Sequence, residues 1–277
     1  MLIDFGYSIL VMGALVSKDA ITVSVIMPAF NDENFISESI CSVISQSYVD
    51  WELIVVDDAS SDNTVNYVES LAHADERIHL IRLKINSGSA VARNTGIKNA
   101  RGRFIAFLDA DDLWLPFKLE KQLSFMRSNG YPFVFSSYNK ININGGVLTS
   151  VCVPSVVSYS SLLKTNSIGC LTAMYDTKFF GKVYMPNIRK RQDLGLWLDL
   201  IRRAKFAYGL NEILAQYRVR SGSVSANKLS AASYTWRLYR DVEKLNFFRS
   251  CYYFGHYAVR GIIRTKMPLL ARKMGLL

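Results

Sequence analysis

Three aspartates, Asp109, Asp111 and Asp112, stand within four positions of one another and have the clearest chemical potential in the chain. Carboxylates this close repel each other and raise one another's pKa unless a cation or hydrogen-bond donors neutralise them. Mg²⁺ or Mn²⁺ is the simplest neutraliser, because it takes one or two protein carboxylates and completes its shell with phosphate oxygens and water. The pattern therefore predicts a metal-diphosphate site. The alternative is a solvated acidic turn that caps the helix beginning near Pro116.

Short apolar runs separated by amphipathic stretches set the expected position of these aspartates. The run at 104–108 ends directly before Asp109, and its β-branched and aromatic residues are typical of a buried strand. The expected strands are 22–27, 53–56, 78–83 and 103–108, and the expected helices are 35–46, a stretch from about residue 63, and 90–100. Strands that alternate with such helices indicate an α/β fold, a Rossmann-like and mostly parallel sheet with helices on both faces.

Polar side chains follow several of the expected strands. Asn31 comes after the first strand, Asp58 after the second, and the three aspartates after the fourth. Open α/β sheets bind their ligands beyond the carboxyl ends of their strands. The sequence therefore predicts one polar, acidic edge of the sheet, and acids gathered there in a basic chain favour a metal over solvation.

The second half of the chain is less regular and more basic. We expect helices at 117–128 and 194–204, a short helix at Tyr159–Lys164, strands at 133–137 and 171–175, a turn at 141–146, extended structure at 206–220 and a helical end from 228. The expected organisation is a flanking segment at 1–21, a main domain at 22–225 whose halves meet near residue 115 (about 22–115 and 116–225), and a helical basic extension at 226–277.

The charge is unevenly distributed in this chain of 277 residues, which has a net charge of +10. Between Asp112 and Asp193 the only acids are Glu120 and Asp176, and no acid follows Glu243. A positive face of that kind suits phosphorylated substrates, nucleic acid or anionic lipid. The four cysteines form no CxxC pair, which favours a reducing compartment.

The stretch at 7–16 is apolar but short, since a membrane span needs about 20 residues. It also lacks the basic flank and the cleavage pattern of a signal peptide. We expect a short flanking helix there, and a protein that is soluble or peripheral to a membrane.

Five segments resemble glycosyltransferase family 2 in their order and spacing. They are VSVIMPAFN at 23–31, LIVVDDAS at 53–60, Asn86-x-Gly88 followed by Ala92-Arg93-Asn94, FLDADDLW at 107–114, and Gln192-Asp193 followed by Trp197. Together they span about residues 22–220, and their combination is specific although each segment alone is weak. The resemblance implies a GT-A type fold, with a nucleotide-binding sheet fused to an acceptor-binding half. It also implies inverting transfer of a sugar from a nucleotide diphosphate, usually UDP, with Mn²⁺ or Mg²⁺.

The same resemblance implies roles for individual residues of the nucleotide half. The residues implied in nucleotide-sugar binding are Pro28, Ala29, Phe30, Asn31, Asp58, Gly88, Arg93, Asn94 and Asp111, with Asp58 near the base and Asp111 near the ribose. The metal ligands implied are Asp109, Asp111 and Asp112. The DxD motif can be Asp109-x-Asp111 or the Asp111-Asp112 pair, and the sequence does not choose between them.

Asp193 matches the catalytic base of the family. The acceptor hydroxyl must lose its proton as it attacks the anomeric carbon from the face opposite the departing diphosphate, and a carboxylate can take that proton. The family usually has Glu-Asp where this chain has Gln192-Asp193, which leaves the base in place but changes how the acceptor is held. The alternative is that Asp193 only caps the helix that follows it.

Residues 218–225 (RVRSGSVS) resemble a segment of transferases that build bacterial O-antigen and capsular repeat units. The expected acceptor or acceptor-diphosphate residues are Arg191, Gln192, Trp197, Arg218 and Arg220. Guanidinium groups bind diphosphates through charge-assisted hydrogen bonds, as a lipid-linked acceptor would require. A solvated basic face is the alternative for each arginine.

The aromatic, apolar and basic stretch at 247–277 favours contact with an anionic membrane. A helix pair packed against the domain would give the same pattern. With the lipid-linked acceptor implied above, the expected location is cytoplasmic, at the inner face of the cytoplasmic membrane.

Three other functions fit the residues less well. A sugar-phosphate nucleotidyltransferase needs a glycine-rich triphosphate loop, which residues 28–31 do not provide. A nucleic-acid-binding module needs a basic aromatic surface without an acidic cluster, so we expect no nucleic-acid partner. A processive synthase would carry QxxRW and membrane spans. The function that the family resemblance implies is that of a hexosyltransferase in surface polysaccharide synthesis, with a lipid-diphosphate-linked saccharide as acceptor. The expected donor is a UDP-sugar, and UDP-glucose or UDP-galactose is expected from that resemblance alone.

Overall fold

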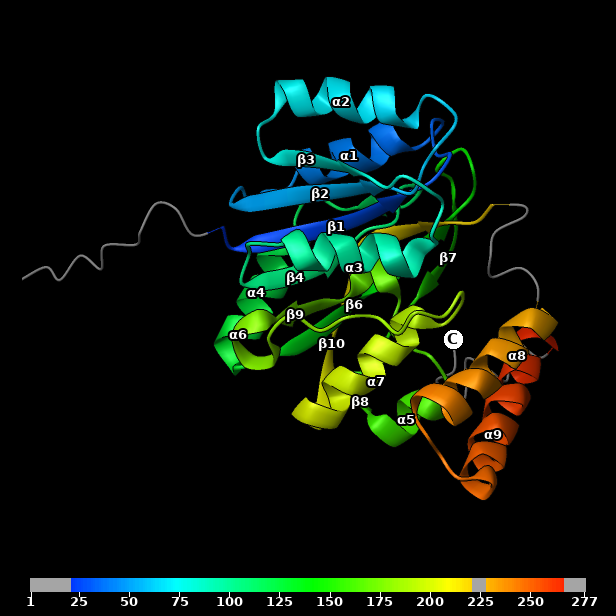
Figure 1. The fold of residues 1–277 in the computed structure, drawn as a ribbon. Coiled ribbons are helices and arrows are strands. Elements are labelled where there is room, and N and C mark those ends of the chain that lie inside the picture. The colour runs from blue at the N-terminus through cyan, green and yellow to red at the C-terminus, as the bar shows by residue number, and fades with distance from the viewer. Residues whose placement is uncertain (1–20, 221–227, 267–277) are drawn as a thin grey trace, which may run out of the picture.

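The computed structural model describes residues 21–220 and 228–266, and its strands form one sheet with helices on both sides (Figure 1). The strands are β1 (Val23–Ala29), β2 (Trp51–Asp57), β3 (Ile78–Arg82), β4 (Phe104–Phe107), β5 (Leu113–Trp114), β6 (Phe133–Ile141), β7 (Val147–Val151), β8 (Val156–Ser158), β9 (Met174–Asp176) and β10 (Phe206–Arg218). The helices are α1 (Ile36–Ile44), α2 (Thr64–Ala74), α3 (Ser89–Asn99), α4 (Lys118–Asn129), α5 (Tyr159–Lys164), η1 (Cys170–Thr172), α6 (Thr177–Phe180), α7 (Gln192–Ala204), α8 (Lys228–Arg237), η2 (Leu238–Val242) and α9 (Phe247–Lys266).

Four strands from the first half form a parallel block in the order β3-β2-β1-β4. The second half joins the same sheet through β9, which pairs antiparallel with both β4 and β6. β10 pairs in parallel with β6 and antiparallel with β5 and β8, while β7 pairs antiparallel with β6. The predicted parallel sheet is thus confirmed in the first half, and the second half mixes directions. The sheet crosses the boundary expected near residue 115, and the domain limits stay a prediction.

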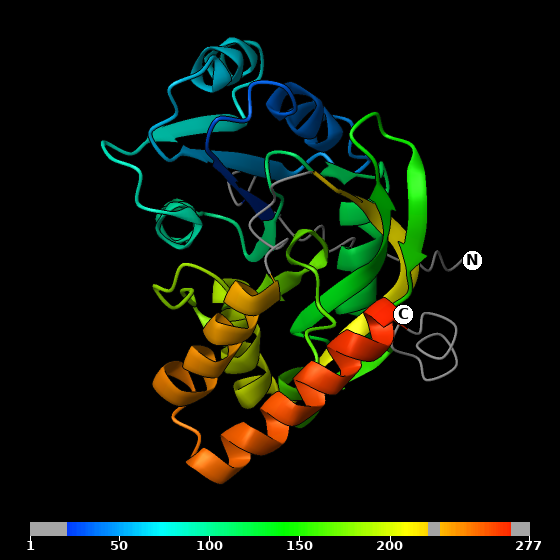
Figure 2. The same ribbon diagram turned by 90° about the vertical axis from the view of Figure 1, so that its right-hand side faces the viewer.

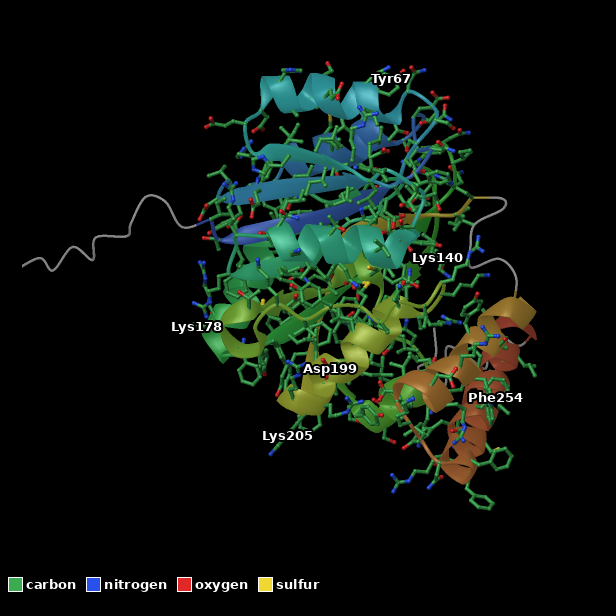
Figure 3. All side chains as sticks on the ribbon, viewed as in Figure 1. Tyr67, Lys140, Lys178, Asp199, Lys205 and Phe254 are labelled. Atoms are coloured by element: carbon green, nitrogen blue, oxygen red, sulfur yellow. The ribbon has the colours of Figure 1, made fainter. Side chains whose placement is uncertain are left out.

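Alternation along the strands divides the interior into two cores. In β1, Val23, Val25 and Met27 face the core covered by α1, α2 and α4, whereas Ile26 faces the core covered by α3, α5 and α7. Successive side chains of a strand point to opposite faces, so a strand that is apolar throughout is buried on both sides. Helix α7 lies over the second core, and Figure 3 marks Asp199 on it. The helices predicted on both faces are therefore confirmed.

The first strand does not stop before Pro28, although the sequence predicted that it ends at residue 27. β1 continues to Ala29, with Pro28 paired to Val56 of β2. The carbonyl of Ile26 accepts from the backbone N–H of Leu108, so the backbone groups of Ile26 point toward the chain at the end of β4. Backbone groups two residues apart in a strand point to the same side, so the nitrogen of Pro28 also points to the side of β4. β4 pairs with β1 only as far as Ile26. No β4 residue is opposite Pro28, and its missing N–H leaves no ladder hydrogen bond unmade.

The second half departs most from expectation, where its elements are short. The strand expected at 171–175 begins only at Met174, because Cys170–Thr172 form a turn of 3₁₀ helix. The elements β5, β7, β8 and α6 are absent from the sequence-based expectation. β5 is two residues long and is held by pairing with Ala215 and Gln216 of β10. Such pieces depend on their neighbours rather than on a periodic pattern of their own.

Helices α8 and α9 form a pair on the side of the molecule toward which β1 and β2 run (Figures 1 and 2). A short π-helical turn, η2, lies between them, and α9 packs against α5, α8 and η2. The expected helical extension is confirmed over the described residues, while the flanking helix expected at 7–16 lies outside them. Within the described ranges, no helix has the length and apolar character that crossing a membrane requires.

Candidate active site

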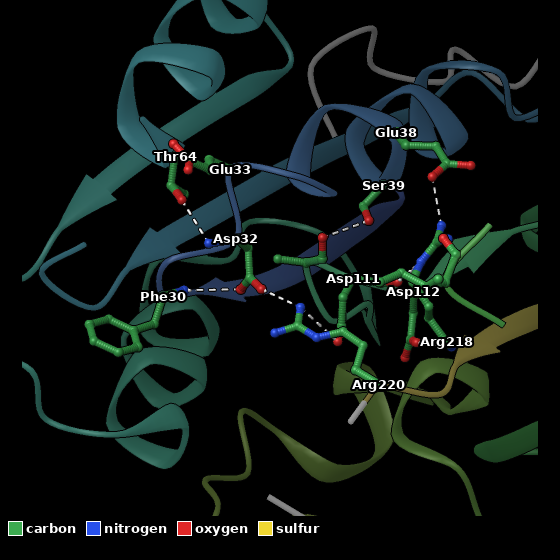
Figure 4. A network of polar contacts seen from close by, with 12 residues as sticks. Phe30, Asp32, Glu33, Glu38, Ser39, Thr64, Asp111, Asp112, Arg218 and Arg220 are labelled. Carbon is green, nitrogen blue, oxygen red and sulfur yellow. Dashed lines mark hydrogen bonds and ion pairs between the residues drawn. The ribbon is translucent and has the colours of Figure 1, made fainter. Parts of the chain in front are cut away.

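The loops after β1 and β2 are joined by hydrogen bonds at the predicted polar edge. The backbone N–H of Asn31 donates to Ser60 Oγ at 3.0 Å, and Asn31 Oδ1 accepts from the backbone N–H of Ser61 at 2.9 Å. The backbone N–H of Asp32 donates to Thr64 Oγ1 at 2.8 Å (Figure 4). Asn31 has a φ of 53°, a left-handed conformation that asparagine tolerates better than most residues. These contacts fix the loop that follows β1, on which Phe30 is exposed, while Pro28 near the end of β1 is partly buried.

Asp58 organises the start of helix α3. Its two carboxylate oxygens accept from the backbone N–H groups of Ser87 and Gly88, each at 2.7 Å. Gly88 has a φ of 90°, which only glycine adopts readily, and α3 begins at the next residue. A carboxylate has about four acceptor positions, so these two bonds leave room for the nucleotide contact expected of Asp58.

The predicted metal ligands form a crowded and largely buried acidic cluster. Asp112 is 1% exposed and accepts from the backbone N–H of Arg218 at 2.8 Å. Burial, and then the charges of Asp111 and Asp109, raise the pKa of Asp112 well above its ordinary value. Burial, and then the neighbouring Asp109 carboxylate, raise the pKa of Asp111 to about 6. Both carboxylates would be stabilised by a nearby cation.

Arg220 provides a cation at this cluster. Its Nη1 lies 2.8 Å from Asp32 Oδ1 and 3.2 Å from Asp111 Oδ2 (Figure 4). The guanidinium also lies over the ring of Phe35. Asp32 is not among the site residues predicted from the sequence.

Arg93 interacts with both the acidic cluster and Asp193, the predicted catalytic base. Its side chain is buried on α3 and forms an ion pair with Asp109. Although burial opposes its charge, Asp109 and Asp193 both raise the pKa of Arg93. Its Nε is buried and has no hydrogen-bond partner among the described residues. One buried guanidinium thus interacts with a carboxylate from the predicted diphosphate site and with the predicted base.

Asp193 lies in the first turn of α7 and is partly buried. The N-cap of this helix is Arg191, with a φ of 67°, and no side chain caps the helix. The contact between α7 and the preceding loop is close, because a Cβ added to Gly195 would lie 2.4 Å from Cγ of Pro186. The N-cap position belongs to Arg191 and no side-chain hydrogen bond from a cap is present there among the described residues, so the structure does not show Asp193 capping α7.

Gln192 and Trp197 lie on the same helix, but the Gln192 side chain has a polar neighbour and the Trp197 side chain has apolar ones. Gln192 is 8% exposed and donates from Nε2 to Ser89 Oγ at 2.6 Å, while its buried Oε1 has no partner in the described part of the chain. Trp197 is fully buried between the rings of Phe107 and Phe133. In this structure Trp197 packs the core beneath the site, and its expected contact with an acceptor stays a prediction.

The three arginines expected at the acceptor also differ in their surroundings. Arg218 is 3% exposed, and it donates to the backbone carbonyls of Asp111 and Ile143 and to the carboxylate of Glu38. It therefore holds the acidic loop and is not an open phosphate ligand in this structure. Arg191 is only partly buried and donates to the Tyr257 hydroxyl at 2.7 Å. Of the three, Arg220 is the one whose guanidinium pairs with the carboxylate of a predicted metal ligand, Asp111.

Asn94 ties α3 to the loop that precedes α7. Its Nδ2 donates to the carbonyl of Met185 at 2.9 Å, and its Oδ1 accepts from the Met185 backbone N–H at 2.8 Å. In this structure Asn94 positions the loop on which α7 rests. Its expected contact with the nucleotide sugar stays a prediction.

We expect Asn94→Ala to lower the free energy of unfolding by about 1–3 kcal/mol, because Met185 would be left with two unpaired backbone groups. Urea denaturation measures the change. Asn99→Ala is the matched control, since Asn99 lies on the same helix and, among the described residues, its side chain bonds only to the carbonyl of Thr95 in that helix. A control change within about 0.5 kcal/mol of zero is expected. Equal losses of stability in both variants would contradict the proposal that Asn94 stabilises the loop through Met185.

The acidic cluster fits a hard divalent metal of the kind that takes few protein ligands. Among the described residues no three acidic, histidine or cysteine side chains surround one point closely enough to hold a metal alone. Mg²⁺ and Mn²⁺ at diphosphate sites usually take one or two carboxylates and complete their shell with phosphate oxygens and water. Asp109, Asp111 and Asp112 provide oxygen donors of that type, and the raised pKa values of Asp111 and Asp112 indicate a shortage of positive charge.

Comparison with known proteins identifies relatives along nearly the whole chain. The chain is 44% identical over 241 residues to TuaG of Bacillus subtilis (strain 168), which is named for teichuronic acid biosynthesis; 87% of this chain and 96% of TuaG are covered. It is 40% identical over 245 residues to WfgD of Escherichia coli, a UDP-Glc:alpha-D-GlcNAc-diphosphoundecaprenol beta-1,3-glucosyltransferase, with coverages of 88% and 95%.

The fold resembles solved glycosyltransferases. TarS of S. aureus, residues 1–349 in complex with UDP-GlcNAc, has a TM-score of 0.68 at 21% identity, covering 91% of this chain and 77% of that one. The sequence model described as Glycosyl transferase family 2 matches residues 24–168. The GT-A fold expected from the sequence is confirmed, and the chain belongs to glycosyltransferase family 2.

Proposed function

We propose that this glycosyltransferase moves glucose from UDP-glucose, with inversion, to a hydroxyl of a saccharide linked through a diphosphate to a lipid, in bacterial surface polysaccharide synthesis. One observation carries the catalytic part of the proposal. Asp193 and Asp109 interact with the same buried guanidinium, Arg93, although they are far apart in the sequence. The charges of both carboxylates act on one guanidinium, which supports placing the base and the diphosphate site at the same sugar.

In the proposed reaction, the carboxylate of Asp193 takes the proton of the acceptor hydroxyl. The hydroxyl oxygen then forms a bond to the anomeric carbon as the bond from that carbon to the β-phosphate oxygen breaks. UDP leaves with the electron pair of the broken bond. Attack from the face opposite the diphosphate inverts the anomeric configuration.

The acidic cluster is proposed to hold Mn²⁺ or Mg²⁺ together with the diphosphate of the donor. The metal would neutralise the charge that develops on the departing UDP. Arg220 already lies between Asp32 and Asp111, which supports a demand for positive charge at this point. Neither DxD register is preferred, because each contains one aspartate that already has a partner. Asp109 is paired with Arg93, and Asp112 accepts from the Arg218 backbone.

The choice of donor and acceptor is supported by the names of two relatives. WfgD and WfaP of Escherichia coli, 40% and 36% identical to this chain, are both UDP-Glc:alpha-D-GlcNAc-diphosphoundecaprenol beta-1,3-glucosyltransferases. A β-linked product from an α-linked donor requires inversion, in agreement with the proposed reaction. An acceptor that carries a polyprenyl lipid would place the reaction at the cytoplasmic face of the membrane.

Calorimetry of UDP binding, with Mn²⁺ and then with EDTA, tests the nucleotide and metal parts of the proposal. We expect binding that depends on the metal. Incubation with radiolabelled UDP-sugars and a synthetic GlcNAc-diphosphate-lipid acceptor then tests the transfer, with UDP-glucose expected to give more product than UDP-galactose or UDP-GlcNAc. Absence of UDP binding in both conditions would contradict the proposed donor class.

A further inference from the structure

Helix α9 has one face packed against the protein. Tyr253 lies against Tyr239 and within hydrogen-bond distance of Ser160, and Phe254 lies against Trp236 on α8 (Figure 3). Tyr257 accepts from Arg191 at the start of α7. Ser250 is fully buried. These inward residues account for the attachment of α9 to the domain.

The opposite face of α9 is apolar and exposed. Its residues recur every three or four positions, so they form one line along the helix. We name this line the outer stripe; it consists of Phe248, Cys251, Tyr252, Gly255, Val259 and Ile262. The exposed fractions are 82% for Phe248, 53% for Tyr252, 54% for Val259 and 60% for Ile262. Aligned apolar side chains exposed to this degree mark an interaction surface more often than isolated ones do.

The surroundings of the outer stripe are positively charged. No acid occurs on α9 or anywhere after Glu243, whereas Lys244, Arg249 and Arg260 belong to the same segment. Glu243 itself is engaged by Arg202 and by the Tyr159 hydroxyl. Lys164 of α5 adds a further cation 5.4 Å from the ring centre of Tyr252. An apolar line on a helix whose charged residues are all basic complements a surface that is apolar inside and anionic outside.

We propose that the outer stripe of α9 is a membrane-docking surface that inserts into the headgroup region of an anionic lipid bilayer. Amphipathic helices with aromatic and aliphatic residues on one side and cations beside them bind such surfaces in this way. A second copy of the chain is a poorer occupant. Pairing two of these helices would bring cations against cations, with no acid on either helix to offset the repulsion.

The position of α9 gives this docking a consequence for the active site. Helices α8 and α9 stand on the side toward which β1 and β2 run (Figures 1 and 2), and the acidic cluster follows the end of β4, which runs parallel to β1. Arg191, the residue before α7, is hydrogen-bonded to α9 through Tyr257. If the proposed function holds, docking on α9 brings the membrane near the base, where the sugar of a lipid-linked acceptor must arrive. The docking surface itself does not depend on that function.

Co-sedimentation of the full chain with vesicles tests the proposal. We expect binding to vesicles of phosphatidylcholine mixed equally with phosphatidylglycerol at least about tenfold tighter than to phosphatidylcholine alone, and weaker in high salt. The Phe248→Ser/Tyr252→Ser variant should lose about tenfold or more in binding to the mixed vesicles. The matched control is Tyr67→Ser/Phe179→Ser, which removes two exposed aromatic side chains, 45% and 58% exposed, from α2 and α6 and should bind as the parent does.

Two further measurements separate the outcomes. UDP binding by calorimetry should be the same in the parent and in the stripe variant, which shows that the variant is folded and keeps the proposed donor site apart from docking. Light scattering after gel filtration reports the oligomeric state. Absence of parent binding to mixed vesicles, or equal binding by parent and stripe variant, would overturn the proposal. A parent dimer that the stripe variant converts to monomers without any vesicle binding would assign the stripe to self-association instead.

Discussion

Replacing Asp193 by asparagine is expected to lower kcat for sugar transfer by about 10²- to 10⁴-fold, the range in which a positioned general base contributes. The amide has nearly the same shape as the carboxylate, but its oxygen cannot hold the proton that the acceptor hydroxyl must lose. Asp193 makes no side-chain cap to α7, so the helix should keep its position. Binding of UDP in the presence of Mn²⁺ should remain near that of the parent.

A matched control is available on the same helix. Asp199 is partly exposed on α7 and pairs with Arg202 and Arg203, so Asp199→Asn removes the same charge six residues further along (Figure 3). Transfer by this control should be almost unchanged, because exposed ion pairs contribute little. If Asp193→Asn weakened UDP binding and transfer to the same extent, Asp193 would be a structural residue and a different base would be needed.

The first half of the fold could be predicted closely because each element carries its own signal. β2 is buried along its whole length and contains the unbroken apolar run at 53–56, and α1 buries only one side of an amphipathic pattern. β5 has two residues and η1 has three, too few for any period. Their positions follow from pairing with β10 and from packing between distant segments, which a local pattern does not contain.

The site could be predicted in its residue types but not in its pairings. The spacing of Asp109, Asp111 and Asp112 indicated a shortage of positive charge, and the structure places Arg220 and Arg93 beside them. Sequence alone could not reveal that Arg218, two positions from Arg220, is buried. Burial there depends on the Asp111 and Ile143 carbonyls and the Glu38 carboxylate, which come from three separate segments. A basic residue therefore looks the same in a sequence whether it binds a phosphate or holds a loop.

Gln192 stands where the family usually has a glutamate, and the structure shows the surroundings of this difference. Its amide nitrogen donates to Ser89 beside the Asp58-bound turn, and its carbonyl oxygen is left unpaired in the buried part of the site. A glutamate at this position would present a charge to the same surroundings. A neutral amide with one free acceptor is suited to a hydrogen bond from a hydroxyl of a bound sugar, and the expected effect of Gln192 on how the acceptor is held stays a prediction.

Asp111→Asn is expected to weaken the metal-dependent binding of UDP by at least about 10- to 100-fold, the range found when the support of a metal ligand is removed. Asp111 lies where burial and Asp109 oppose its charge, and Arg220 is the cation that it shares with Asp32. Asparagine keeps an oxygen donor but removes the negative charge that attracts Mn²⁺. Calorimetry with Mn²⁺ and with EDTA measures the change, and the residual affinity of the variant should equal that of the parent in EDTA.

Comparison of three single variants then identifies the metal ligand. Asp109→Asn also breaks the ion pair with Arg93, so it should disturb the region of the base as well, whereas Asp112→Asn can keep accepting from the Arg218 backbone. Glu120→Gln is the control, because Glu120 is an exposed acid in the first turn of α4 that bonds only to Ser47 among the described contacts. Normal affinity in Asp111→Asn together with loss in Asp112→Asn would move the metal to Asp112 alone. Normal affinity in all three aspartate variants would leave Arg220 and Arg93 as the groups that neutralise the diphosphate, because they are the cations that the structure places beside these carboxylates.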